Sequence, residues 1–481
     1  MNKFYITTAI PYVNGKPHLG HALEYFQADT IRRYQQKLGK ETLLLSGADE
    51  NALKNVQAAE KENIPVTKFL EKNSRTFEEA FSKLGVKLDV FQRGSDQKLH
   101  WPGVQKLWKL CAENGDIYKK SYEGLYCVGC ESFKTESELT SEGLCPEHLV
   151  KPELVKEENY FFRLSKYQKQ ILDLIEKNTL QIIPENKRAE TLGFVKKGLE
   201  DFSISRSKKR AKGVGVPVPD DPNQVMYVWF DALTIYMTGV GFATDEEKWK
   251  KWWPADVHII GKDINRFHTV YWPAMLLSAK LPLPKTILIH SFVLAQGGQK
   301  MSKSLGNVVD PFDLAEKFGV EALRYYLLSQ ISLSEDGEIS PDRFKEVYNA
   351  DLANGLGNLV ARVAKLCELV KYQQIESQEA EHIFEQDKYL EALNEFRFND
   401  ALAFVWKKIS AADKYIDETK PWELIKKEDP RLRGVLSHLV GELQEIAQLL
   451  EPFLPQTAQK IEQQFKGPEI ISTTSMFPRI N

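Results

Sequence analysis

The chain has 481 residues, with 64 Lys and Arg against 67 Asp and Glu, and 42% of its residues are hydrophobic. This length corresponds to about three or four domains with large buried cores, and the ordinary composition excludes a disordered or fibrous protein. The net charge of −3 excludes a protein that binds nucleic acid through bulk positive charge. No run approaches the ~18 apolar residues of a membrane helix, and the first residues do not have the pattern of a signal peptide. With only five cysteines, a reducing cytoplasmic compartment fits best.

The first part of the chain alternates predicted strands and helices. Apolar runs at 4–10 and 42–47 predict buried strands, and a helical pattern follows each of them. This alternation is typical of a parallel sheet, and such sheets bind ligands beyond the carboxyl ends of their strands. We therefore expect residues 11–21 and 47–51 to line one site.

Composition changes at about residue 116, where a segment rich in lysine and glutamate begins. We interpret residues 116–224 as an insertion between two halves of the sheet. The strand pattern resumes in apolar runs at 225–230, 257–261 and 286–290, which predict further buried strands.

After about residue 344 the strand patterns stop, and apolar residues recur at helical spacing, as from Leu436 to Leu450. Residues 346–481 contain 16 Lys and Arg against 22 Asp and Glu, so this predicted helical bundle has a net charge of −6. The predicted fold class is therefore α/β, a split Rossmann-type parallel sheet with an insertion, followed by an all-α bundle. The predicted domains are 1–115 (first half of the sheet domain), 116–224 (insertion), 225–296 (second half), 297–345 (loop and connecting region) and 346–481 (bundle).

The first chemical motif spans residues 11–21. Glycine and proline end a predicted strand there, and His18 and His21 share the first turn of the following helix. Imidazole donors and free backbone N–H groups at a helix N-terminus stabilise a phosphate group. Gly20 leaves room for a flat ring to approach the backbone. A polar helix cap with two exposed histidines is the ordinary alternative.

The second motif is a loop, residues 297–307, that carries Lys300 and Lys303 after the last predicted strand. Mobile ammonium groups suit a step in which pyrophosphate departs, although most such loops are only solvated basic segments. In this order and at this separation, the two motifs resemble the HIGH and KMSKS signatures of class I aminoacyl-tRNA synthetases. The first signature falls at residues 18–21 and the second at residues 300–304.

Within this class, the extended first motif is similar to that of the methionyl-tRNA synthetases. The resemblance continues through residues 228–232, 261–275 and 418–422 and covers essentially the whole chain. It implies an ATP-dependent, AMP-forming methionine–tRNA ligase, which makes methionyl-adenylate and transfers methionine to the 3′ end of tRNA(Met), with Mg²⁺ bridging the phosphate oxygens. The implied catalytic residues are His18, His21, Lys300 and Lys303, and the implied ATP-binding residues are Gly20, Gly261 and Asp263 together with His18, His21 and Lys303.

Methionine selection requires an apolar slot for the thioether and an acid for the ammonium group. Aromatic rings suit sulfur, with contacts worth about 0.3–1.5 kcal/mol, although a place in the core is the more common fate of aromatic residues. The resemblance places the acid at Glu50 or Asp49, and where many relatives have Asp-Glu-His-Gly this chain has Asp-Glu-Asn-Ala at residues 49–52. The slot implied by the resemblance consists of Ile10, Tyr12, Trp229, Ala232, Leu233, Tyr236, Ile264, Phe267 and His268.

Three of the five cysteines lie close together in the sequence. Cys127 and Cys130 form one short pair, and Cys145 and His148 form a second pair after fourteen intervening residues. Three thiolates and an imidazole suit tetrahedral zinc, and four ligands leave no open position, so we expect one structural Zn²⁺. A redox pair or unrelated buried thiols are the alternatives.

The resemblance places tRNA anticodon recognition at Asn358, Arg362 and Trp422, because single-stranded loops are read by stacking and base-edge hydrogen bonds. Each of these residues also has an ordinary structural interpretation, as a helix-end amide, a solvated cation or a core ring. The insertion is short for a relative that edits its product. A synthetase for a neighbouring amino acid and an inactive tRNA-binding relative stay open. The lack of an added C-terminal domain predicts a monomer.

Overall fold

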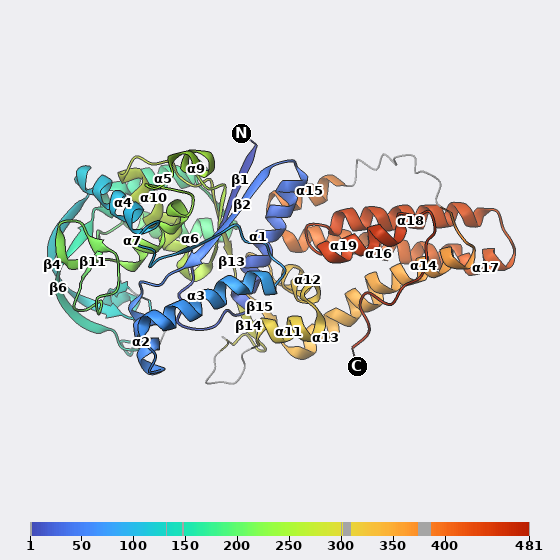
Figure 1. Ribbon diagram of the computed structural model, residues 1–481, viewed down its shortest axis with the longest axis horizontal. Helices are drawn as coiled ribbons and strands as arrows, with labels where there is room; N and C mark the ends of the chain where they lie inside the picture. The colour runs from blue at the N-terminus through green and yellow to red at the C-terminus, as the bar shows by residue number, and fades with distance from the viewer. Residues whose placement is uncertain are drawn as a thin grey trace. The chain divides into compact units, whose positions relative to one another are not determined.

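The computed structural model describes residues 2–130, 132–146, 149–299, 301, 309–373 and 386–480 (Figure 1). The chain forms two compact units. Residues 1–17 and 39–290 make the first unit, and residues 18–38 and 291–481 make the second. The helix that begins after His18 therefore belongs to the second unit, although the segments on either side of it belong to the first.

The first unit is built on a six-stranded parallel sheet with the strand order β3-β2-β1-β12-β13-β7, which confirms the predicted α/β fold class. Its central strands are buried, because helices cover parallel sheets on both faces. The strands are β1 (Lys3–Thr8), β2 (Glu41–Ala48), β3 (Val90–Arg93), β7 (Gln181–Ile183), β12 (Val257–Gly261) and β13 (Thr286–His290). The helices of this unit are α2 (Leu53–Lys61), α3 (Val66–Lys83), α4 (Trp101–Glu113), α5 (Gln168–Glu176), α6 (Glu185–Lys196), α7 (Val228–Ala232), α8 (Ile235–Thr238), α9 (Glu246–Trp252) and α10 (Trp272–Ser278).

Two small antiparallel sheets complete the first unit, in the orders β5-β4-β6-β8 and β10-β11-β9. The long hairpin of β4 and β6 pairs Ile117 with Phe162 at one end and Tyr126 with Glu153 at the other, beside the cysteine cluster. The strands are β4 (Ile117–Cys127), β5 (Ser132–Lys134), β6 (Glu153–Phe162), β8 (Phe202–Ser203), β9 (Ser205–Ser207), β10 (Pro217–Val218) and β11 (Asp221–Met226).

The structure corrects two sequence predictions in this unit. Residues 116–224 are predicted to form an insertion separate from the main sheet, but strand β7 within this range pairs with β13 at the edge of that sheet, so the chain returns to the sheet partway along the range. The run 225–230 was expected to be a strand of the main sheet, but it divides between the end of β11 and the helix α7. All five residues of α7 are buried, and an apolar run of this length does not distinguish a buried strand from a buried helix.

The second unit is mainly helical, and α16, α18 and α19 lie side by side in it (Figure 1). The stripe predicted from Leu436 to Leu450 lies in α18 with its apolar members buried. Past residue 344, every regular element that the structure describes is a helix, as predicted. The elements are α1 (Leu19–Lys37), β14 (Val293–Ala295), α11 (Pro311–Phe318), α12 (Val320–Gln330), β15 (Gly337–Ile339), α13 (Pro341–Val347), the π-helix η6 (Tyr348–Gly357), α14 (Asn358–Leu369), α15 (Gln386–Asn394), α16 (Phe398–Thr419), α17 (Pro421–Lys426), α18 (Arg431–Leu450) and α19 (Pro455–Phe465).

A buried ion pair joins α1 to the later helices of its unit. The Arg324 side chain of α12 is only 2% exposed, and its Nη1 lies 2.6 Å from Oδ2 of Asp29 on α1. Its Nη2 donates to Oγ1 of Thr30 at 3.0 Å and to the carbonyl of Pro452 at 2.9 Å. Removing one partner of such a pair costs about 3–5 kcal/mol, so these bonds hold α1 firmly to α12 and to the segment that follows α18.

Among the described residues, no helix combines the length and the apolar character needed to cross a membrane.

Candidate active site and metal centre

The histidines of the first motif cap the helix α1. The Nδ1 atom of His18 accepts from the backbone N–H of Gly20, and Nδ1 of His21 accepts from the backbone N–H of His18, both at 3.1 Å. Because each Nδ1 accepts, a neutral ring carries its proton on Nε2, which is then a donor. The ring centroids lie 3.9 Å apart at the positive end of a 19-residue helix. This arrangement can stabilise a phosphate, as the sequence indicates.

From the sequence, we expect Gly20 to leave room for a flat ring near the backbone. The structure also shows that the ring of His18 lies close to Gly20. A Cβ atom at Gly20 would lie 3.0 Å from Cε1 of His18. A larger residue at this position would therefore push the His18 ring away from the cap.

The segments at 11–12 and 49 lie side by side at the ends of β1 and β2, as predicted. The backbone N–H of Asp49 donates to the carbonyl of Pro11 at 2.9 Å, and Tyr12 forms a parallel bridge with Asp49. Both positions belong to the first unit, and Asp49 is buried.

The predicted aromatic members of the methionine slot form one cluster. Trp229 of α7 stacks on Phe267, with ring centroids 3.8 Å apart and an interplanar angle of 4°. The Tyr12 ring meets Trp229 edge-on at 6.1 Å, and so does the His268 ring. Ala232 at the end of α7, Leu233 after it and Tyr236 of α8 are all buried. Ile10 and Ile264 are half-buried and pack against the core that contains Leu233 and Tyr236.

Hydrogen bonds fix the protonation of His268. Its Nδ1 lies 3.0 Å from the carbonyl of Ile264, which can only accept, so this nitrogen carries the proton. Its Nε2 then accepts from the hydroxyl of Tyr236 at 2.8 Å. Burial lowers the pKa of His268 to about 4, against the hydrogen bond to Ile264, which raises it. The cluster therefore presents a neutral imidazole at physiological pH.

The two candidate acids for the ammonium group differ in their surroundings. The Glu50 carboxylate is fully buried, and Oε1 accepts from Oγ of Ser74 at 2.6 Å and from Nη2 of Arg93 at 2.8 Å. Its Oε2 accepts from the hydroxyl and the backbone N–H of Ser95. Both oxygens of Glu50 are thus engaged within the protein. The sequence analysis missed these three partners, and no motif marks them.

At the end of β12, Gly261 is buried and Asp263 is exposed in the short 3₁₀ turn η3 (Lys262–Ile264). A Cβ atom at Gly261 would lie 2.8 Å from Oδ1 of Asp263, so only glycine keeps this carboxylate in place. His290, the last residue of β13, pairs with Gly261 across the β12–β13 register.

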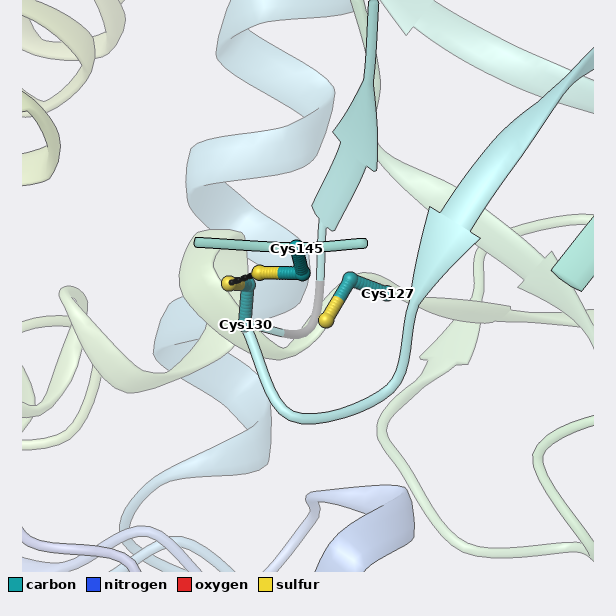
Figure 2. Close-up of side chains that lie close together, drawn as sticks. All are labelled: Cys127, Cys130 and Cys145. Atoms are coloured by element: carbon teal, nitrogen blue, oxygen red, sulfur yellow. Dashed lines mark hydrogen bonds between the residues drawn. The ribbon is translucent and has the colours of Figure 1, made fainter. Parts of the chain in front are cut away.

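The three cysteines converge at the end of the β4–β6 hairpin (Figure 2). Their sulfur atoms lie within 4.8 Å of one another, and Sγ of Cys130 is 3.5 Å from Sγ of Cys145. Cys127 and Cys145 are buried, and all three are free thiols. Sulfur atoms gathered at this separation fit a metal ion, and soft thiolate ligands favour zinc. His148, the fourth predicted ligand, lies outside the described residues.

Lys300 and Lys303 of the second motif also lie outside the described residues. Ahead of them, the backbone N–H of Gly297 donates to Oε2 of Glu338 at 3.2 Å.

The predicted anticodon residues lie on α14 and α17 of the second unit. Asn358 is exposed at the start of α14, and Trp422 is 40% exposed after Pro421. Arg362 is not a solvated cation, because it donates to Asp413 at 3.1 Å and to Asp417 at 2.8 Å on α16.

Comparison with known proteins defines the class first. Residues 4–151 and 148–364 match the family model "tRNA synthetases class I (M)", and residues 386–481 match the "Anticodon-binding domain of tRNA ligase". With its parallel sheet and its histidine-capped helix, the chain is thus a class I tRNA synthetase in fold. The methionine–tRNA ligases of Brucella suis and Thermotoga maritima are 42% and 39% identical to it over 95% of this chain, and the alignments span 91% and 74% of those proteins.

A solved structure gives the same result. The Mycobacterium tuberculosis methionyl-tRNA synthetase in complex with methionyl-adenylate superposes with a TM-score of 0.92 and 37% sequence identity, over 100% of both chains. The chain belongs to the methionine–tRNA ligase family.

The lowered pKa of His268 predicts a specific loss of stability in acid. An unfolded histidine has a pKa near 6.5. Between about pH 6.5 and pH 4, His268 is therefore protonated in the unfolded chain but not in the folded chain. The contribution of His268 to the free energy of unfolding is therefore fully present above pH 6.5, and it falls by roughly 3 kcal/mol as the pH drops to about 4. In urea unfolding at a series of pH values, His268→Gln should show a shallower decline across this window than the unchanged chain. Equal slopes for the two proteins would contradict the assignment.

Proposed function

We propose that this chain is a methionine–tRNA ligase that charges tRNA(Met) in two steps. In the first, a carboxylate oxygen of methionine attacks the α-phosphorus of ATP, and the bond to the β-phosphate oxygen breaks. In the second, a hydroxyl of the terminal ribose of tRNA attacks the carbonyl carbon of methionyl-adenylate, and AMP leaves. The observation that carries the proposal is the aromatic cluster around Trp229, in a chain that matches methionine–tRNA ligases over 95% of its length.

Transfer of this kind requires charge neutralisation and alignment rather than a covalent catalyst. His18 and His21 donate from Nε2 to phosphate oxygens, as their Nδ1 bonds to the cap favour. Lys300 and Lys303 stabilise the departing pyrophosphate, and Gly261 and Asp263 bind the ribose of ATP. Mg²⁺ enters with ATP as its usual counterion and neutralises the phosphate charge.

Methionine is selected by a mainly apolar site, although the Lys54 ammonium group lies 3.1 Å from the centroid of the Tyr12 ring at its edge. The stacked faces of Trp229 and Phe267 suit a polarisable sulfur. Neutral His268 adds a polar edge without a charge, and its bond to Tyr236 holds it in place. A site of this kind disfavours charged amino acids, because a charge without a partner is costly to bury.

Asp49 is our choice for the acid that binds the methionine ammonium group. Both oxygens of the alternative, Glu50, are already engaged by Ser74, Arg93 and Ser95. Asp49 also bridges directly to Tyr12, a member of the aromatic cluster.

The helical unit reads the anticodon. Asn358 and Trp422 are exposed, so an amide and a ring are available for base edges and stacking. The two aspartates that pair with Arg362 hold its guanidinium on the same helical unit. The net charge of −6 in residues 346–481 requires that recognition rest on a few side chains.

Cys127, Cys130, Cys145 and His148 hold one structural zinc ion at the end of the hairpin. The support for this assignment is the convergence of three thiols within 4.8 Å. Reduced thiols of this kind also support the cytoplasm as the compartment. The monomeric state stays a prediction.

The central test of this function is amino-acid-dependent exchange between ATP and pyrophosphate. We expect exchange with methionine and none with isoleucine, leucine, valine or cysteine, because only methionine combines a flexible chain with sulfur. The matched variant His18→Ala should lose most of the exchange. Exchange with another member of the panel would indicate a synthetase for that amino acid. No exchange by the folded chain would favour a tRNA-binding protein without catalysis.

Separate substitutions of the two acids distinguish their roles. Asp49→Asn should raise the KM for methionine by about 10- to 100-fold, since a hydrogen bond to a charged group contributes about 1.5–3 kcal/mol. Glu50→Gln should mainly lower the thermal midpoint, because Arg93 would lose its buried partner. The opposite pattern would assign the ammonium group to Glu50. Exchange kinetics and thermal melts of both variants provide the measurement.

Metal analysis tests the zinc site. The purified chain should contain one zinc ion per molecule, and Cys145→Ala should lose it and melt at a lower temperature. Cys111→Ala is the matched control, because Cys111 is a buried free thiol outside the cluster. Full zinc content in Cys145→Ala, or none in the unchanged chain after zinc is supplied, would refute the site.

A further inference from the structure

A series of hydrogen-bonded polar side chains includes Asp231 on α7, the helix that also carries Trp229. Asp231, two residues further along α7, is 1% exposed, and its two oxygens face two different partners. Oδ1 lies 2.6 Å from Nε2 of His100, and Oδ2 accepts from Nδ2 of Asn51 at 2.6 Å. The other nitrogen of His100, Nδ1, lies 2.8 Å from Oγ1 of Thr238 on α8. His100 is itself fully buried.

This polar chain connects three parts of the proposed methionine site. Asn51 belongs to the same short loop as Asp49, between β2 and α2. Asp231 lies on α7, with Trp229 and Ala232 on either side of it in the sequence. Thr238 ends α8, which carries Tyr236 and so reaches His268. One buried carboxylate thus ties the loop of the candidate acid to both helices of the aromatic cluster.

The loop is fixed from a second direction as well. The same Nδ2 of Asn51 donates to the carbonyl of Gly94 at 2.9 Å, so both of its hydrogens are used. The side chain of Asn55 donates to the carbonyl of Asp49 at 2.8 Å. With the backbone held in this way, the contact between Asn51 and Asp231 sets the distance from the loop to α7.

We propose that Asn51 and His100 are positioning residues for methionine binding, and this inference rests on the proposed function. Neither residue touches the substrate. Through Asp231, they hold the Trp229 face, which receives the sulfur, at a fixed distance from Asp49, which receives the ammonium group. The site must bind the sulfur and the ammonium group of one small substrate at the same time. A displacement of a binding group by about 1 Å can lower the rate by as much as 100-fold.

The sharpest variant is Asn51→Asp, which keeps the shape of the side chain but sets a second carboxylate against Asp231. We expect the KM for methionine in ATP–pyrophosphate exchange to rise about 10-fold, as for the loss of one buried hydrogen bond between polar groups. The KM for ATP should stay unchanged. The stabilisation of the thermal midpoint by added methionine, which requires no catalysis, should shrink in parallel.

Asn114→Asp is the matched control. Asn114 donates to Oδ2 of the buried Asp116 at 2.7 Å, so this change also opposes two carboxylates, but the other side chains bonded to Asp116 are Lys166, Tyr167 and Ser278, which are not members of the aromatic cluster. It should lower the thermal midpoint as Asn51→Asp does and leave the KM for methionine unchanged.

A second pair of variants tests the contact between His100 and Asp231. His100→Gln keeps a donor for Asp231 and should retain nearly the original KM for methionine, whereas His100→Leu removes both bonds and should raise it like Asn51→Asp. This pair also keeps the proposal testable where one variant fails to fold. An unchanged KM for methionine in both Asn51→Asp and His100→Leu would overturn the proposal. So would an equal rise in the KM for methionine and for ATP, which indicates general loosening. Absence of methionine-dependent exchange by the unchanged chain would instead refute the proposed function.

Discussion

The parallel pairing of β1 with its two neighbours determines where the chemistry of the first unit lies. Ile6 of β1 stands beside Leu44 of β2 on one side and Val257 of β12 on the other, and all three strands run in the same direction. The segments that leave these strands therefore begin at one edge of the sheet. Tyr12 and Asp49, proposed for methionine, and Gly261, proposed for ATP, all lie at or just beyond these strand ends, and this is why residues far apart in the sequence can belong to one proposed site.

Near that edge, several buried polar groups are engaged by other groups of the protein. Glu50 and Asp231 are buried carboxylates with every oxygen engaged, so they fix the backbone around the site. Burial keeps His268 neutral, against its hydrogen bond to the carbonyl of Ile264, and its two hydrogen bonds hold the ring in place. The result is an aromatic cluster whose ring faces are rigidly held, although it contains only neutral side chains. Such pre-organisation lowers the entropy cost of binding an unbranched, flexible side chain.

The sequence predicts the parts of this protein whose signals are local or repeated. The runs that became β1, β2, β12 and β13 are apolar on both faces, and the stripe of α18 has the period of a helix, so these elements follow directly from hydrophobic pattern. Strand β7 is too short for any pattern, and only its pairing with β13 assigns it to the sheet. The helix α7 was mistaken for a strand because every one of its five residues is buried, which removes the periodicity that distinguishes the two. The motif residues were accessible by resemblance, whereas the partners of Glu50 and the His100–Asp231 contact depend on folding and leave no trace in the order of residues.

The ion pair between Asp29 and Arg324 has a consequence for synthesis of the chain. The two residues are separated by 295 positions, and Pro452, which also binds Arg324, is later still. The helix that presents His18 and His21 therefore leaves the ribosome long before the groups that hold it exist. During that interval Asp29 lacks Arg324 and has only Arg33, four residues along the same helix, as a cationic partner. The second unit can close around α1 only when almost the whole chain has been made. Contacts of such long sequence separation fold slowly. The histidine-capped helix α1 is thus among the first segments to be synthesised and among the last to reach its final packing.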